Sequence, residues 1–123
     1  MKFLDSNILA YAFYGNHYTI KCQKAIREGG LIDTFNLIEA FFIIEKETSR
    51  EIAQKSIKGI LKSSIQIVDV DVNLVFEALK KANSYKLSIF DLIHYSCALL
   101  NNCNSFVTYD KDFDNLDIPR EEP

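Results

Sequence analysis

Short apolar segments that alternate with helix-length segments are the feature that most constrains this fold. Segments of strand length are predicted at residues 2–5, 31–35, 65–70 and 105–109. Helical periodicity is found around and between them, at residues 7–15, 18–30, 36–47, 49–64, 71–85 and 88–102. This alternation is typical of parallel βαβ units. We therefore expect an α/β fold in which helices cover both faces of a mainly parallel sheet.

Size and composition indicate one globular domain spanning residues 1–123. Hydrophobic residues make up 48% and charged residues 25% of the chain, the balance of an ordinary folded protein. No apolar run reaches the length of about 18 residues that a membrane span needs. The first residues lack the features of a signal peptide, and the three cysteines show no CxxC spacing. A cytoplasmic protein with reduced thiols, without a membrane partner, is expected.

The charge of the chain is acidic overall. The formal net charge is -3 and the sequence pI is about 5.3, which by itself weighs against a general nucleic-acid binder. An acidic total can nevertheless coexist with a local basic surface, so this argument alone does not exclude an RNA substrate.

Acidic residues follow the predicted strands, where the functional crevice of a parallel α/β sheet lies. Asp5 closes the first strand, and Asp110 follows the fourth. Glu39 comes shortly after the second strand, and Asp91 lies near the start of the helix at residues 88–102. We expect these four carboxylates to converge at the carboxyl edge of the sheet.

Helix capping is the alternative explanation for these acids. Glu39 follows Asn36, and Asp91 follows Ser88, at the spacing of a capping box. Asp5 fits the cap of the next helix. Capping does not explain the strongly apolar neighbours of Glu39 and Asp91, among which no lysine or arginine is found. A buried charge needs a partner, so we expect a cation from outside the chain.

Four motifs give the chain its resemblance to a known family. Asp5-Ser6-Asn7 after a hydrophobic strand, Glu39 in NLIEA, Asp91 in LSIFDLIHYSCAL, and residues 108–113 resemble the PIN-domain nucleases, in particular the small VapC-type toxins. The resemblance covers essentially the whole chain. It implies a three-layer α/β/α sandwich and an Mg²⁺- or Mn²⁺-dependent ribonuclease. It also implies an RNA substrate, a small antitoxin partner and a homodimer.

The same resemblance assigns roles to individual residues. It implies metal binding and catalysis by Asp5, Glu39, Asp91 and Asp110, with Asp112 as a further metal ligand. Asn7 and Thr108 match polar positions that support the acids. His94 departs from the pattern, since an apolar residue is expected there. We interpret it as a histidine tolerated at the edge of the core rather than a substrate contact.

Three other interpretations were weighed. Asp110, Asp112, Asp114 and Glu121 match an EF-hand loop, but Asn115 replaces the required glycine and Pro119 interrupts the loop. A phosphate-accepting receiver domain would have paired acids after its first strand, which are missing. A PIN fold that binds RNA or protein without cutting remains the open alternative.

Overall fold

Strand β1 (Lys2–Leu4) lies at the centre of a five-stranded sheet in which all neighbouring strands are parallel. The structure is a computed structural model that describes residues 1–123. The strand order is β3-β2-β1-β4-β5. The other strands are β2 (Leu31–Asp33), β3 (Gln66–Val68), β4 (Ser105–Val107) and β5 (Arg120–Glu121).

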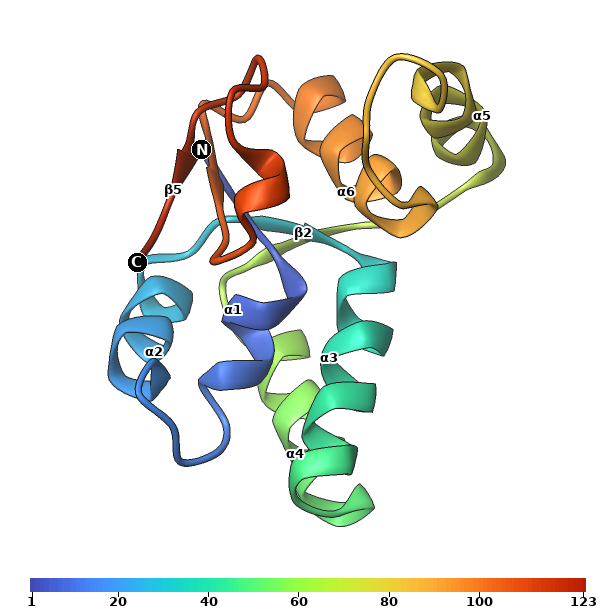
Figure 1. The fold of residues 1–123 in the computed structure, drawn as a ribbon. Coiled ribbons are helices and arrows are strands. Elements are labelled where there is room, and N and C mark those ends of the chain that lie inside the picture. The colour runs from blue at the N-terminus through green and yellow to red at the C-terminus, as the bar shows by residue number, and fades with distance from the viewer.

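Helices cover the two faces of this sheet unequally (Figure 1). One face carries α1 (Ser6–Tyr11), α2 (Thr19–Glu28), α3 (Thr34–Glu47) and α4 (Arg50–Leu61). The other face carries α5 (Val72–Lys81) and α6 (Ile89–Leu100). A short 3₁₀ turn, η1 (Lys111–Phe113), follows β4. The predicted three-layer α/β/α sandwich is therefore confirmed.

Neighbouring strand residues point into two separate cores, one on each face. Phe3, Leu31 and Phe106 belong to the core under α5 and α6. The next residue of each strand belongs to the core under α1 to α4; these residues are Leu4, Ile32 and Val107. Because both faces of a parallel sheet are covered, successive residues of its inner strands can be apolar without alternating with polar ones. This explains why the strands appear in the sequence as continuous apolar runs.

The junction between β2 and α3 differs from the prediction. Residues 34 and 35 were expected to continue the strand, but α3 begins at Thr34. Asp33 caps this helix: its side chain accepts from the Asn36 backbone N–H, and the Asn36 side chain accepts from the Asp33 N–H. This reciprocal capping ends the strand two residues early.

Two further differences lie near the ends of the chain. Helix α1 ends at Tyr11, four residues before the expected stop at Gly15. Strand β5 is not predicted from the sequence; it pairs with β4 through bonds from Phe106 N to Pro119 O and from Thr108 N to Glu121 O. A two-residue strand leaves no hydrophobic periodicity to detect. None of the helices combines the length and hydropathy needed to cross a lipid bilayer.

Candidate active site

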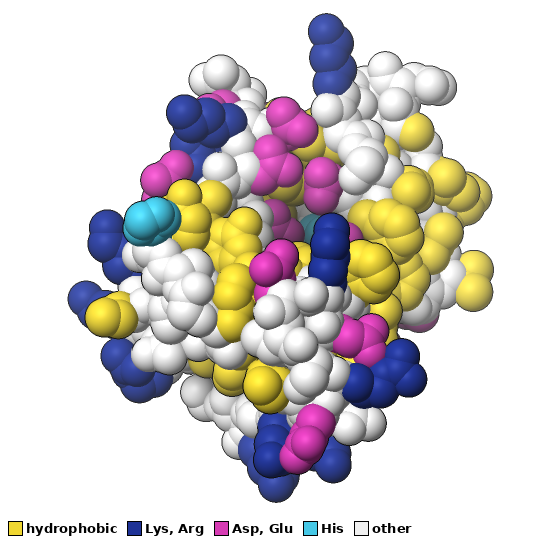
Figure 2. All heavy atoms as spheres, turned by 60° about the horizontal axis from the view of Figure 1, so that its bottom comes forward, with side chains coloured by type: hydrophobic (Ala, Val, Ile, Leu, Met, Phe, Trp, Pro, Cys, Tyr) yellow, Lys and Arg dark blue, Asp and Glu magenta, His cyan; other side chains and the backbone are white.

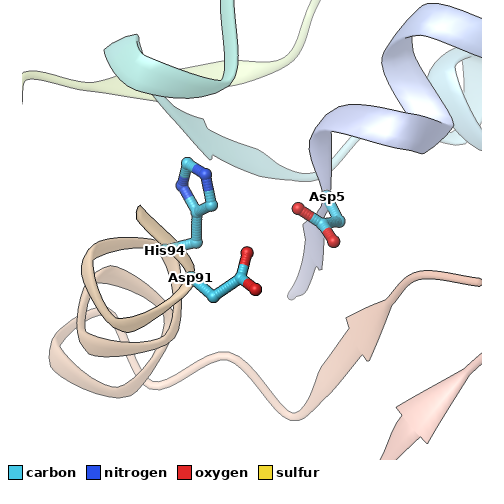
Figure 3. Close-up of side chains that lie close together, drawn as sticks. All are labelled: Asp5, Asp91 and His94. Atoms are coloured by element: carbon cyan, nitrogen blue, oxygen red, sulfur yellow. The ribbon is translucent and has the colours of Figure 1, made fainter. Parts of the chain in front are cut away.

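The carboxylates of Asp5 and Asp91 face each other at the carboxyl edge of the sheet (Figure 3). Asp5 follows β1 and caps α1; its Oδ1 accepts from the Ser6 backbone N–H at 2.8 Å. Asp91 lies in the first turn of α6, which places its side chain opposite the end of β1. Asp5 is only 5% exposed. Two acids from distant parts of the chain are thus brought together in a poorly hydrated place.

Thr108 connects the ends of β1 and β4. Its hydroxyl donates to Asp5 Oδ2 at 2.8 Å and accepts from Asn7 Nδ2 at 3.2 Å. It also accepts from the Asp110 backbone N–H at 3.0 Å. Thr108 is fully buried. The two polar residues that the resemblance assigned to supporting positions, Asn7 and Thr108, therefore hold the Asp5 carboxylate and the start of the Asp110 loop.

Glu39 is held from α3 by two donors on one oxygen. Its Oε1 accepts from Ser6 Oγ at 2.6 Å and from His94 Nε2. The Asn36–Glu39 capping box considered from the sequence does not form, because Asp33 is the N-cap of α3. Ser88 does cap α6, accepting from the Asp91 backbone N–H at 3.2 Å. This cap uses the backbone N–H of Asp91, which any residue but proline would supply, so capping explains neither the carboxylate of Asp91 nor the surroundings of Glu39.

His94 lies inside the protein between two acidic side chains, not at the edge of the core as we expected. It is fully buried, and its ring bridges two acids, with Nδ1 2.7 Å from Asp33 Oδ2 and Nε2 against Glu39 Oε1. Its interpretation as a histidine tolerated at the core edge was wrong. The expectation that Glu39 lacks a basic partner within the chain was also wrong, because that partner is His94.

Asp33 is the residue that the sequence analysis overlooked. It ends β2 in the same way that Asp5 ends β1, and it is fully buried. An acid at the end of a second, adjacent strand was the available signal. The apolar pattern predicts one continuous strand over residues 31–35, which places Asp33 inside the strand rather than at its end.

The acids influence one another electrostatically. Burial raises the pKa of Asp91 to about 6, and the nearby charges of Asp5 and Asp110 act in the same direction. Burial also raises the pKa of Asp5, although His94 opposes this. For Glu39, burial acts to raise the pKa, but the hydrogen bond and the positive charge of His94, together with the hydrogen bond from Ser6, make the net shift downward. The four carboxylates therefore form one coupled group.

His94 supplies positive charge to this group. Burial alone would lower the pKa of the imidazole, but its bonds with Asp33 and Glu39 raise it to about 10. No lysine or arginine forms an ion pair with Asp5, Glu39, Asp91 or Asp110. One imidazolium does not balance the negative charge of Asp33 and these four acids. The excess negative charge would favour binding of a cation.

Oxygen ligands suited to a hard cation gather here. Potential ligand atoms of Asp5, Asp91 and His94 all lie within 4.8 Å of one another. Both ring nitrogens of His94 already contact carboxylates, which leaves the oxygens of the acids as the available donors. Carboxylate oxygens suit hard cations such as Mg²⁺ or Mn²⁺. Acidic side chains gather around a hollow on this face of the molecule, with hydrophobic side chains on either side (Figure 2).

Comparison with known protein families agrees with this arrangement. The profile of the PIN domain matches residues 2–119, nearly the whole chain. The chain belongs to the PIN-domain family. No curated protein matches the sequence.

Solved structures with a similar fold include three that extend over nearly all of this PIN domain. VapC20 from Mycobacterium tuberculosis, described as a sarcin-ricin loop cleaving toxin, has a TM-score of 0.84 at 13% identity and 100% coverage of both chains. A toxin-antitoxin complex from Klebsiella pneumoniae has a TM-score of 0.73 at 18% identity, covering 95% of this chain and 93% of the other. VapBC2 from Rickettsia felis, bound to promoter DNA, has a TM-score of 0.72 at 18% identity, covering 98% and 97%.

The other acids considered in the sequence analysis lie in the loop after β4 of this PIN domain. Asp110 is half-buried and caps η1, its Oδ1 accepting from the Asp112 backbone N–H at 2.9 Å. Asp112 and Asp114 are exposed, and Asp114 pairs with Arg120 of β5. Water and Arg120 thus offset the repulsion among the outer acids. The loop continues into β5, and the second helix that an EF-hand requires does not follow it.

Proposed function

We propose that this PIN domain is an Mg²⁺- or Mn²⁺-dependent endoribonuclease that hydrolyses RNA phosphodiester bonds. The observation that carries the proposal is the facing pair Asp5 and Asp91, coupled to Glu39 and Asp110 and without a lysine or arginine partner. These four acids would be the metal ligands and catalytic groups. Asp112, exposed on η1, would assist.

The chain's own residues have distinct tasks in this proposal. A divalent cation would lower the pKa of a nearby water molecule and stabilise negative charge on the phosphoryl group. Asp5 and Asp91 would present oxygens from opposite sides of the hollow. Thr108 would hold Asp5 in orientation, with Asn7 fixing Thr108 in turn. Asp110 would close the site on the side of β4.

We further propose a role as the toxin of a toxin-antitoxin pair. The support is the similarity of the whole fold to VapC20 and to two toxin-antitoxin assemblies. A small antitoxin protein would then hold the enzyme inactive, and the enzyme would act in the cytoplasm, as a homodimer. Co-expression with the product of an adjacent short reading frame should relieve growth inhibition if this role is right.

The central experiment is cleavage of labelled RNA by the purified protein, with Mn²⁺, with Mg²⁺ and with EDTA. We expect cleavage only with a divalent ion. Asp5→Asn and Asp91→Asn should each reduce the rate at least about 100-fold while the circular dichroism spectrum is retained. Glu51→Gln, on the exposed start of α4, is the matched control and should cleave normally. A folded protein that binds RNA without cutting it under any condition would instead be a non-catalytic PIN module.

A further inference from the structure

We infer that a closed ring of hydrogen bonds through His94 positions Glu39 for cation binding, and that His94 itself is not a ligand of the cation. The inference rests on the proposed function, because it assigns a task to Glu39 in the proposed site. The inference is supported by a set of hydrogen bonds that connect residues of β2, α3, α6 and the start of α1.

The ring has five members and can be followed from one residue to the next. Asp33 Oδ2 accepts from His94 Nδ1 at 2.7 Å, and His94 Nε2 donates to Glu39 Oε1. The same Glu39 oxygen accepts from Ser6 Oγ at 2.6 Å. Ser6 Oγ accepts from Asn36 Nδ2 at 2.9 Å. Asn36 closes the ring, because its backbone N–H donates to Asp33 Oδ1 at 3.0 Å.

Four of the five residues in this ring are buried, and only Glu39 is partly exposed to solvent. Asp33, Asn36 and His94 are fully buried, and Ser6 is 6% exposed. The Glu39 side chain is the exception at 33% exposure. A buried polar network whose members are all bonded holds its side chains in one arrangement. The ring therefore fixes Glu39 while leaving it the only member with a partly exposed side chain.

The two oxygens of Glu39 are consequently unequal. Oε1 takes both donors of the ring, and Oε2 forms no hydrogen bond within the protein. Oε2 is thus the oxygen available to a cation. Residues that orient metal ligands in this way typically change metal affinity by about 10- to 100-fold when they are replaced.

His94 lies close enough to Asp5 and Asp91 to be mistaken for a third ligand. Each ring nitrogen, however, faces a carboxylate oxygen, which accepts hydrogen bonds when ionised. Both nitrogens are therefore donors, and neither offers the lone pair that coordination requires. To bind the cation through Nδ1, His94 would have to leave the buried Asp33 Oδ2 without a partner. To bind it through Nε2, His94 would have to give up its bond to Glu39 Oε1.

A matched pair of substitutions separates the two contacts of His94. The amide of glutamine reaches the position of Nε2 and can still donate to Glu39. The shorter asparagine reaches only the position of Nδ1 and retains the bond to Asp33. We expect the Mn²⁺ dissociation constant, measured by electron paramagnetic resonance, to rise about 10-fold in His94→Asn and to stay within about 3-fold of wild type in His94→Gln. Equal affinity in both variants, whether unchanged or weakened, would overturn the inference.

Ser6→Ala provides a second variant in case His94→Asn does not fold. It removes the other donor to Glu39 Oε1 and opens the ring, while His94 remains in place. We expect Mn²⁺ binding about 3-fold weaker, with the weakening lost when Glu39 is already replaced by glutamine. Weakening of the same size in the Glu39→Gln background would show that Ser6 acts elsewhere and contradict the ring.

Nuclear magnetic resonance of the His94 ring tests the inference without any activity assay. Both ring N–H signals should be present in the metal-free protein and should persist in saturating Mg²⁺. Glu39→Gln should shift the Nε2–H signal more than the Nδ1–H signal. Loss of either N–H signal on adding Mg²⁺ would identify His94 as a ligand and overturn the inference. If wild type binds no cation at all, the proposed function fails, whereas the response to Glu39→Gln still reports on the ring.

Discussion

Asp5 and Asp91 direct their carboxylates at each other, although one follows β1 and the other begins α6. Their closeness is imposed by the fold and is unfavourable by itself, since like charges in a poorly hydrated site repel. The same pair would favour a divalent ion strongly. Stability and ion binding should therefore be linked, which makes the site accessible to measurements that need no substrate.

Asp91→Asn should stabilise the metal-free protein at neutral pH. The pKa of Asp91 is raised to about 6, so the folded state binds this proton more tightly than the unfolded state. The ionised group therefore costs stability above pH 6, and that cost disappears as the pH falls towards 4. After allowance for partial solvent exposure, we expect a gain of about 1 kcal/mol, or about 4 °C in Tm, at pH 7.5 with EDTA.

The check is thermal unfolding at two pH values. The stabilisation by Asp91→Asn should be smaller at pH 5 than at pH 7.5. Asp69→Asn, at an exposed position after β3, serves as the control and should change Tm little at either pH. Destabilisation by Asp91→Asn at pH 7.5 would mean that the carboxylate is not under electrostatic stress.

Divalent ions should raise the thermal stability of the wild-type protein. A ligand at 100 times its dissociation constant stabilises the folded state by about 2.7 kcal/mol, which corresponds to roughly 10 °C for a domain of this size. Calorimetry with Mn²⁺ should detect this shift in wild type and find it largely absent in Asp5→Asn. An equal shift in both proteins would place ion binding outside the proposed site.

His94 should make stability decline at alkaline pH. Its pKa is raised to about 10 in the folded protein, so its bonds to Asp33 and Glu39 contribute fully below pH 6.5. This contribution is lost as the pH rises through 10. The difference in Tm between wild type and His94→Gln, in EDTA, should therefore be larger at pH 6 than at pH 10. A difference that does not vary with pH would mean that the imidazole is neutral throughout.

Thr108→Val should destabilise the protein although it hardly changes side-chain volume. The substitution removes the donor to Asp5 and the acceptor used by Asn7 and by the Asp110 backbone N–H. Buried groups left without a partner cost about 1–3 kcal/mol. Urea unfolding measures this loss. Thr108→Ser keeps the hydroxyl and should lose less; equal losses in the two variants would attribute the effect to packing.

The sequence predicted those parts of the fold that have a strong local signal. Strands buried on both faces contain nearly continuous apolar runs, so β1 and β4 could be predicted together with the acids that follow them. The contact of His94 with Asp33 and Glu39 has no such signal, because it depends on how α6 packs against β2 and α3. Strand β5 was missed for a related reason: its two residues pair through the backbone and contain no apolar pattern.

The four proposed ligand residues are supplied by separate parts of the chain, and the last of them follows β4. A polypeptide emerging from the ribosome would present Asp5, Glu39 and Asp91 well before Asp110. Strand β4 also lies between β1 and β5, so the sheet cannot close beside Asp5 until β4 has been synthesised. The order of synthesis would thus delay assembly of the acidic cluster until β4 and the Asp110 loop have left the ribosome.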